Sequence, residues 1–199
     1  MNPFLQGWSN TSGSPTPWVA SPSVFGVLPY PTPAPTLAPA TPKLDTYTFS
    51  SSSGTVLNSV VTGPHSQRYF RVTTDSTTAG FSVVQNVRNE SIAMIEWRKH
   101  PVVEIIGIVS KRNSAQWLTL SPDKASRLMN VRGRNFLWMP DDRCISLYSA
   151  SSSNPQFFGR VSQNQNGTTI EMTAEALQVG LLETFVVSTL LLMSGRNID

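Results

Sequence analysis

The segment Ala174–Met193, AEALQVGLLETFVVSTLLLM, decides the fold of this chain. It contains no proline and is rich in leucine, alanine, glutamate and methionine, so it predicts one helix of about 20 residues, about 30 Å long. Thr173 is a suitable N-cap, and Gly195 suits the position just after the helix. Apolar side chains point in nearly every direction around this helix, and such a helix lies in a protein core or in a bilayer.

The sequence favours the protein core over the bilayer. The length of the helix fits a membrane span. However, Glu183 lies near its middle, and a carboxylate in the centre of a bilayer costs about 3 kcal/mol. We therefore expect a buried core helix, with a membrane-inserted tail anchor as the alternative.

The residues from Lys43 to Thr173 read as short strands separated by turn signals such as Gly63-Pro64, Pro140-Asp141-Asp142 and Asn166-Gly167. About eleven strands are predicted, at residues 46–49, 55–61, 68–73, 81–87, 92–97, 102–109, 116–120, 135–139, 145–148, 157–162 and 168–172. A sheet closed around the helix would bury it and leave no free strand edge. The expected fold is therefore mainly β, a closed antiparallel barrel of about 11–12 strands around the helix at 174–193.

Residues 1–42 differ from this body in composition. They hold ten of the fifteen prolines and no charged residue. Proline removes backbone donors and fixes φ, so we expect a disordered proline-rich tail before a domain at 43–199. The tail is either a flexible extension or a ligand for proline-recognition modules through Pro31, Pro33 and Pro35. It lacks the basic segment and continuous apolar core of a signal peptide, which predicts an intracellular protein, cytoplasmic or peripheral to a membrane.

Several short motifs resemble an uncharacterised fungal family, domain of unknown function 6593. They are Ile95-Glu96-Trp97, His100-Pro101, Val103-Glu104-Ile105, Trp117-Leu118, Arg132-Gly133 with Trp138, Gly180-Leu181-Leu182-Glu183 and the ending Ser194–Asp199. More remotely, the architecture resembles the tubby C-terminal-like fold of tubby proteins, phospholipid scramblases and LURP-one-related proteins. The resemblance implies a fold and no reaction. Neither the phosphoinositide site of tubby proteins nor the calcium site of scramblases has a matching motif here.

The chain offers little material for catalysis. The single cysteine excludes an intramolecular disulfide framework and a multi-cysteine zinc site, and the two histidines leave little material for a histidine-rich metal centre. Cys144, in a strand, is expected to be a small buried hydrophobe, and His100 a turn histidine bonded to the backbone. Asp141 and Asp142 read as an ordinary turn. No nucleophile elbow, phosphate loop or metal-ligand spacing occurs, so we predict no catalytic, cofactor-binding or metal-binding residue.

Basic residues are concentrated between positions 98 and 134. The cluster consists of Arg98, Lys99, Lys111, Arg112, Lys124, Arg127, Arg132 and Arg134. Only Glu104 and Asp123 oppose it within that segment. If the turns that carry these residues meet at one end of the barrel, they form a cationic rim suited to anionic lipid headgroups. The alternative is a set of solvated loop charges. Nucleic acid is not expected as a partner, because aromatic residues interleave poorly with the basic ones.

These observations predict a non-enzymatic binding or adaptor module that contacts anionic phospholipid or phosphoinositide membranes through the basic cluster. One alternative is a structural or protein-interaction scaffold whose proline-rich tail engages protein partners. A second alternative is a scramblase-like protein anchored in the membrane by its last helix.

Overall fold

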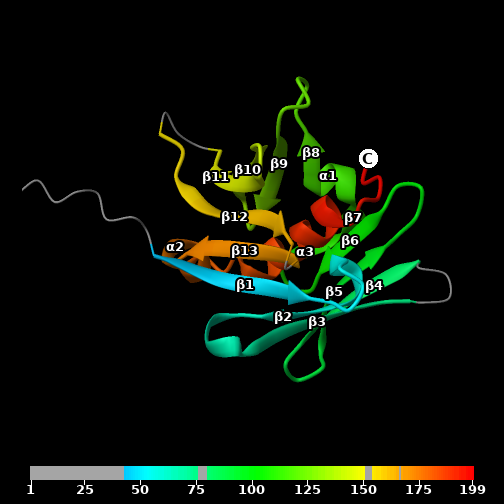
Figure 1. Ribbon diagram of the computed structural model, residues 1–199. Helices are drawn as coiled ribbons and strands as arrows, with labels where there is room; N and C mark the ends of the chain where they lie inside the picture. Colours follow the sequence, from blue (N-terminus) through cyan, green and yellow to red (C-terminus); the bar gives the residue numbers. More distant parts are fainter. Residues whose placement is uncertain (1–42, 76–79, 151–153, 166) are drawn as a thin grey trace, which may run out of the picture. The chain divides into compact units, whose positions relative to one another are not determined.

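A computed structural model describes residues 43–75, 80–150, 154–165 and 167–199 (Figure 1). The predicted proline-rich tail at residues 1–42 lies outside this part of the chain. The strands are β1 (Leu44–Ser50), β2 (Ser59–Thr62), β3 (Arg68–Thr74), β4 (Phe81–Asn86), β5 (Ser91–Glu96), β6 (Val102–Ile105), β7 (Val109–Asn113), β8 (Leu118–Leu120), β9 (Arg127–Val131), β10 (Arg134–Pro140), β11 (Cys144–Ser149), β12 (Phe157–Asn164) and β13 (Gly167–Thr173). The helices are η1 (Val56–Asn58), η2 (Pro64–Ser66), α1 (Ser114–Trp117), α2 (Ala174–Gln178) and α3 (Leu182–Met193).

All thirteen strands form one antiparallel sheet, in the order β7-β6-β5-β4-β3-β2-β1-β13-β12-β11-β10-β9-β8. The prediction of a mainly β fold with a C-terminal helix is confirmed. The predicted closed barrel is not supported, because β7 and β8 are the two edges of the sheet. Strand directions alternate, so the first and last of thirteen strands run the same way. Pairing them would make a parallel ladder, which needs a crossover of a dozen or more residues, whereas only α1 connects them.

Two errors in the sequence prediction change the number of strands, and the predicted strands at 55–61 and 116–120 are shortened by η1 and α1. The run at 102–109, predicted to be one strand bent at Gly107, is a hairpin of β6 and β7. Ile105 pairs with Val109 across the turn, and Gly107 has φ 74°. The prediction also missed β9, which pairs with β10 across a two-residue turn of Arg132 and Gly133, with φ 50° and 78°. Positive φ at both central residues is typical of the type I′ hairpin turn.

The prediction of one helix at 174–193 is wrong, because the chain breaks between α2 and α3. Gly180 has φ 75°, a left-handed conformation that glycine adopts without steric cost. The Gly180 N–H donates to Leu177 O and the Leu181 N–H donates to Ala176 O, which is the Schellman end of α2. The predicted N-cap is confirmed, since Thr173 Oγ1 accepts a hydrogen bond of 3.2 Å from the Ala176 N–H.

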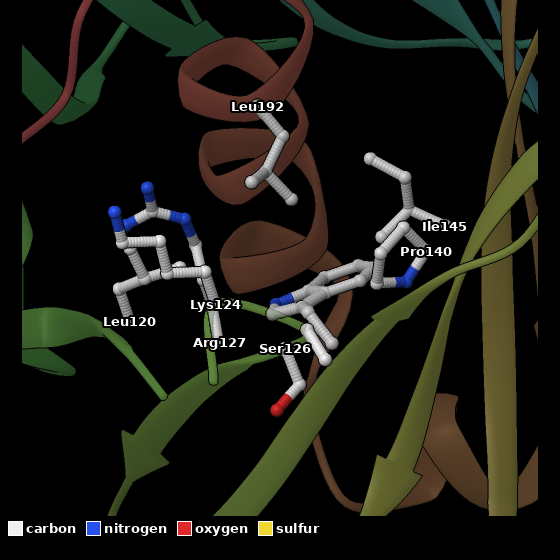
Figure 2. Close-up of a pocket in the computed structure, with 9 residues that line it drawn as sticks. Leu120, Lys124, Ser126, Arg127, Pro140, Ile145 and Leu192 are labelled. Atoms are coloured by element: carbon white, nitrogen blue, oxygen red, sulfur yellow. The ribbon is translucent and has the colours of Figure 1, made fainter. Parts of the chain in front are cut away.

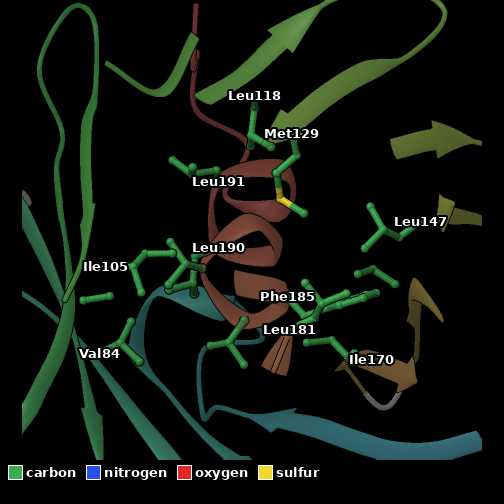
Figure 3. Packing of buried hydrophobic residues seen from close by; sticks show 14 of the residues in the cluster. Val84, Ile105, Leu118, Met129, Leu147, Ile170, Leu181, Phe185, Leu190 and Leu191 are labelled. Atoms are coloured by element: carbon green, nitrogen blue, oxygen red, sulfur yellow. The ribbon is translucent and has the colours of Figure 1, made fainter. Parts of the chain in front are cut away.

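Helix α3 fills the concave side of the sheet (Figures 1 and 3). Phe185, Leu190 and Leu191 are buried against strand residues that include Ile105 and Ile170. This confirms the expected core position of the helix. In the described part of the chain, no helix has the length and apolar character needed to cross a membrane.

Buried hydroxyl groups on α3 bond to the helix itself. The hydroxyls of Thr184, Ser188 and Thr189 donate to carbonyl oxygens three or four residues earlier, at 2.6–2.7 Å. Each polar group is thereby satisfied within the helix, so its burial is tolerated.

The last six residues, Ser194–Asp199, cross the gap between β7 and β8; we call them the C-terminal clasp. Ile198 is buried, and its carbonyl oxygen accepts a hydrogen bond of 2.7 Å from Ser114 Oγ of α1. On one side of the gap, His100 Nδ1 lies 3.2 Å from the main-chain oxygen of Asp199, as expected for a histidine bonded to the backbone. On the other side, Arg127 of β9 binds the Asp199 carboxylate. The clasp therefore bonds to the loop before β6, to α1 and to β9.

Candidate functional site

The structure divides the eight predicted basic residues between the two ends of the sheet. Because neighbouring strands alternate in direction, the ends of β5 and β7 and the start of β9 fall at the same end, which also holds the C-terminal clasp. We call it the clasp end. The six basic residues there are Arg98, Lys99, Lys111, Arg112, Lys124 and Arg127. Arg132 and Arg134 lie at the opposite end, where they line a cavity with Gln178 and Val179.

Glu96 binds two of the six cations. Its carboxylate accepts a hydrogen bond from Lys111 Nζ and lies 2.5 Å from Arg98 Nη2. The hydrogen bond from Lys111 and, less strongly, the charge of Arg98 hold the pKa of Glu96 below its usual value. Glu96 is buried at the end of β5, so its negative charge offsets part of the positive charge at this end.

Asp199 binds a third cation, Arg127. The guanidinium donates two hydrogen bonds to the carboxylate, at 2.8 and 2.6 Å, and a third of 2.9 Å to Leu118 O. The bond from Arg127 lowers the pKa of Asp199. The side chain of Arg127 is only 15% exposed, so these bonds hold its guanidinium in one place.

The other three cations, Lys99, Arg112 and Lys124, are exposed. The guanidinium of Arg112 donates hydrogen bonds to the main-chain carbonyl oxygen and to the hydroxyl oxygen of Ser110, at 3.2 and 2.8 Å. Within the described residues, no carboxylate oxygen lies within 4.0 Å of a side-chain nitrogen of these three residues. At the clasp end they are the three residues of the predicted basic cluster that form no ion pair within the described residues.

A cavity of about 170 Å³ opens at the clasp end, beside the last turn of α3 (Figure 2). We call it the clasp-end cavity. It is lined by Leu120, Lys124, Ala125, Ser126, Arg127, Trp138, Pro140, Ile145 and Leu192. Figure 2 shows Leu192 above it, Arg127 and Leu120 on one side, and Pro140 and Ile145 on the other. The cavity thus combines an apolar wall with two cations.

Trp138 forms part of this wall and carries an unusual polar atom. The residue is 1% exposed, and its Nε1 is a buried donor that finds no hydrogen-bond acceptor among the described residues. A buried unsatisfied donor costs about 1–3 kcal/mol. The sequence analysis missed this cavity, because residues from four separate stretches of the chain form it.

Cys144 and the turn at Asp141 and Asp142 have contacts within their own strand or turn. Cys144 is half-buried with Sγ 3.8 Å from Ser146 Oγ. The Asp142 N–H donates to Asp141 Oδ1 within the predicted turn, at 2.8 Å. In the part of the chain that the structure describes, no three histidine, cysteine or acidic side chains gather as a metal site would require.

The ion pair of Asp199 gives a prediction about pH. Because the folded-state pKa of Asp199 lies below its unfolded value of about 3.9, the pair stabilises the fold above that pH and loses its contribution as the pH falls through the folded-state pKa. We expect Asp199→Asn to lower the free energy of unfolding at pH 7 by up to about 1 kcal/mol, since the carboxylate is partly exposed. Urea unfolding of both proteins across acid pH measures the difference, which should vanish well below the usual carboxyl range.

The same series contains its own control. Glu96 also has a lowered pKa, but both proteins retain it, so its titration cancels in the difference. A difference that stays constant from neutral to strongly acid pH would show that the Asp199→Asn substitution acts through packing and not through the lost charge.

Comparison with known proteins gives a family and one structural likeness. Residues 54–197 match a family described as a family of unknown function, DUF6593. No curated protein matches the chain. An X-ray structure of a protein from Arabidopsis thaliana is similar with a TM-score of 0.43 and 10% sequence identity, over 74% of this chain and 90% of that chain.

Proposed function

This chain belongs to the family of unknown function DUF6593, and we propose that it is a non-enzymatic binding module that attaches to anionic phospholipid membranes through its clasp end. The observation that carries the proposal is the gathering of Lys99, Arg112 and Lys124 at one end, exposed and without carboxylate partners in the described residues. Basic residues near an anionic membrane surface contribute about 1 kcal/mol each. Phosphoinositide headgroups, which carry more charge, fit the same surface.

The proposal also includes the fungal origin and the tubby-like fold that the sequence resemblance implies. A fungal origin is supported by the motifs that run from Ile95-Glu96-Trp97 to the C-terminal clasp, and a tubby-like fold by the architecture of a β-rich body that ends in an apolar helix.

Vesicle binding by two charge-matched double variants tests the membrane proposal. We expect Lys99→Gln with Lys124→Gln to weaken binding of the full chain to phosphatidylserine vesicles about thirty-fold at low salt. Arg132→Gln with Arg134→Gln removes the same charge from the opposite end and should change binding less than two-fold. Co-flotation at several vesicle concentrations, at low and high salt, measures both.

The outcomes separate three interpretations. Binding that salt abolishes and that only the clasp-end pair weakens supports the proposal. Equal weakening by both pairs would mean that net charge alone attracts the protein, and the proposed surface would be wrong. Unchanged binding in the Lys99 and Lys124 variant would also overturn it.

A second candidate function is a protein-interaction scaffold, and the outer face of the sheet favours it. Leu128 of β9 and Met139 of β10 are 40% and 44% exposed. Met139 also lines a cavity of about 360 Å³ with Tyr148 and Pro155. On this proposal, protein partners bind the proline-rich residues 1–42 or this outer face, and the chain binds no vesicles.

A further inference from the structure

We propose that the clasp-end cavity binds a small amphiphilic anion, with its apolar body inside the cavity and its phosphate or carboxylate at Lys124 and Arg127. This inference goes beyond the proposed membrane function, because the cavity requires no bilayer to be filled. The same chemistry describes a lipid headgroup with part of its chain and a free organic phosphate or acid.

The size and lining of the cavity limit the size and polarity of the apolar part of the ligand. Its volume is about 170 Å³, and an apolar cavity of about 150 Å³ can hold benzene. The wall consists mainly of Leu120, Trp138, Ile145 and Leu192. These dimensions suit one ring or a short acyl chain, and the apolar wall disfavours a sugar.

The two cations at the cavity, Lys124 and Arg127, favour an anionic ligand. Lys124 is exposed and has no carboxylate partner in the described residues, whereas Arg127 is largely buried and already binds the carboxylate of Asp199 in a bidentate manner. An arginine fork held in this way is oriented for a second anionic oxygen. The carboxylate of Asp199 therefore shows how an anionic group can bind Arg127. It also competes with the ligand's anionic group for the same guanidinium.

The unsatisfied indole of Trp138 supplies an independent reason to expect a ligand. Nε1 is a donor without a partner in the described residues, in a side chain that forms the cavity wall. Because Nε1 is fully buried, a ligand oxygen can satisfy this donor only if neighbouring side chains at the cavity shift. Buried polar atoms without partners are rare in native proteins, and a missing ligand is one physical explanation for them.

The test uses hexyl phosphate as the probe, with hexanol and inorganic phosphate as its two halves. The full chain, labelled with ¹⁵N, gives one indole N–H signal for each of its five tryptophans, and Trp138→Phe identifies that of Trp138. We expect hexyl phosphate to shift this signal saturably, and each half alone to bind at least ten-fold more weakly.

Three variants locate the anionic group. Lys124→Gln should weaken hexyl phosphate binding about five-fold, whereas Lys99→Gln, at the same end but outside the cavity, should leave it unchanged. Asp199→Asn should tighten it, since it removes the competing carboxylate. The absence of a saturable shift at the Trp138 indole, or equal effects of Lys124→Gln and Lys99→Gln, would overturn the proposal.

A competition experiment separates the two sources of ligand. If hexyl phosphate displaces the full chain from phosphatidate vesicles, the cavity binds the lipid headgroup itself. If hexyl phosphate binds and vesicle attachment persists, the cavity binds a free anion and the membrane surface lies elsewhere on the clasp end. Lys99→Gln weakens only vesicle attachment, so failure of the membrane proposal and failure of the cavity proposal give different results.

Discussion

Replacing Phe185 by alanine is expected to lower the free energy of unfolding by about 3–5 kcal/mol. Phe185 is fully buried on α3, and its ring meets that of Trp138 edge to face, with centroids 4.9 Å apart and an angle of 73°. Alanine at this position would leave a cavity enclosed by the sheet, which cannot collapse to fill it. Because single domains are stable by only about 5–15 kcal/mol, this loss would remove much of the stability.

Urea unfolding followed by circular dichroism measures this loss, provided that the dependence on urea concentration is unchanged. Leu182→Ala on the same helix is the matched control, because Leu182 is only half-buried and should lose less than half as much. A loss below about 1 kcal/mol for Phe185→Ala would contradict a tightly packed helix core.

Replacing Gly159 by alanine is expected to cost about 3 kcal/mol, through overpacking. A β-carbon there would lie 2.4 Å from the Glu171 carbonyl oxygen, 2.9 Å from Phe185 Cζ and 3.1 Å from Met172 Cα. Two of these three atoms belong to the backbone of β13, which pairs with β12. They cannot move without breaking that ladder, so only glycine allows β12 to lie this close to β13 and α3.

Thermal unfolding should show a fall in the midpoint of about 10 °C for Gly159→Ala. Arg160→Ala is the control on the same strand: it removes an exposed ion pair with Glu171 and should cost at most about 1 kcal/mol. Adding Phe185→Leu to Gly159→Ala should not restore stability, since the nearest clash is with a backbone oxygen. A rescue would mean that the aromatic ring, and not the ladder, forbids a side chain at this position.

The position of the last helix could be predicted because its apolar character extends around its whole circumference. Its interruption could also have been predicted, since Gly180 followed by Leu181 is a common way to end a helix. The prediction treated Gly180 as an interior glycine because apolar residues continue on both sides of it. Helix propensity alone cannot distinguish the two cases; the hydrogen bonds that end α2 decide between them.

The open edge of the sheet could not be predicted from strand patterns alone. Whether a ring of antiparallel strands can close depends on the exact number of strands. The turn at Ile106-Gly107 and the strand β9 were both missed, so the predicted number of strands was wrong. The Arg132-Gly133 turn was recognised, and a strand before it would have followed from the rule that such turns join two strands.

The basic residues of the candidate site were found from local charge density, but their grouping was not. Charge density treats Lys124 and Arg132 as neighbours, whereas strand β9 separates them to opposite ends of the sheet. The pairing of Arg127 with Asp199 joins residues 72 positions apart. The clasp-end cavity likewise brings together Leu120, Trp138, Ile145 and Leu192, whose spacing in the sequence does not predict that they share a cavity.

The location of α3 near the end of the sequence has a consequence for synthesis. The ribosome makes every strand, from Leu44 to Thr173, before the helix that covers their inner faces. At typical rates of elongation this interval is on the order of ten seconds. During it the nascent strands expose apolar surface that nothing yet covers, which is the state in which chains aggregate or require chaperones. Premature termination anywhere before Leu182 should therefore yield an aggregating product and not a smaller folded one.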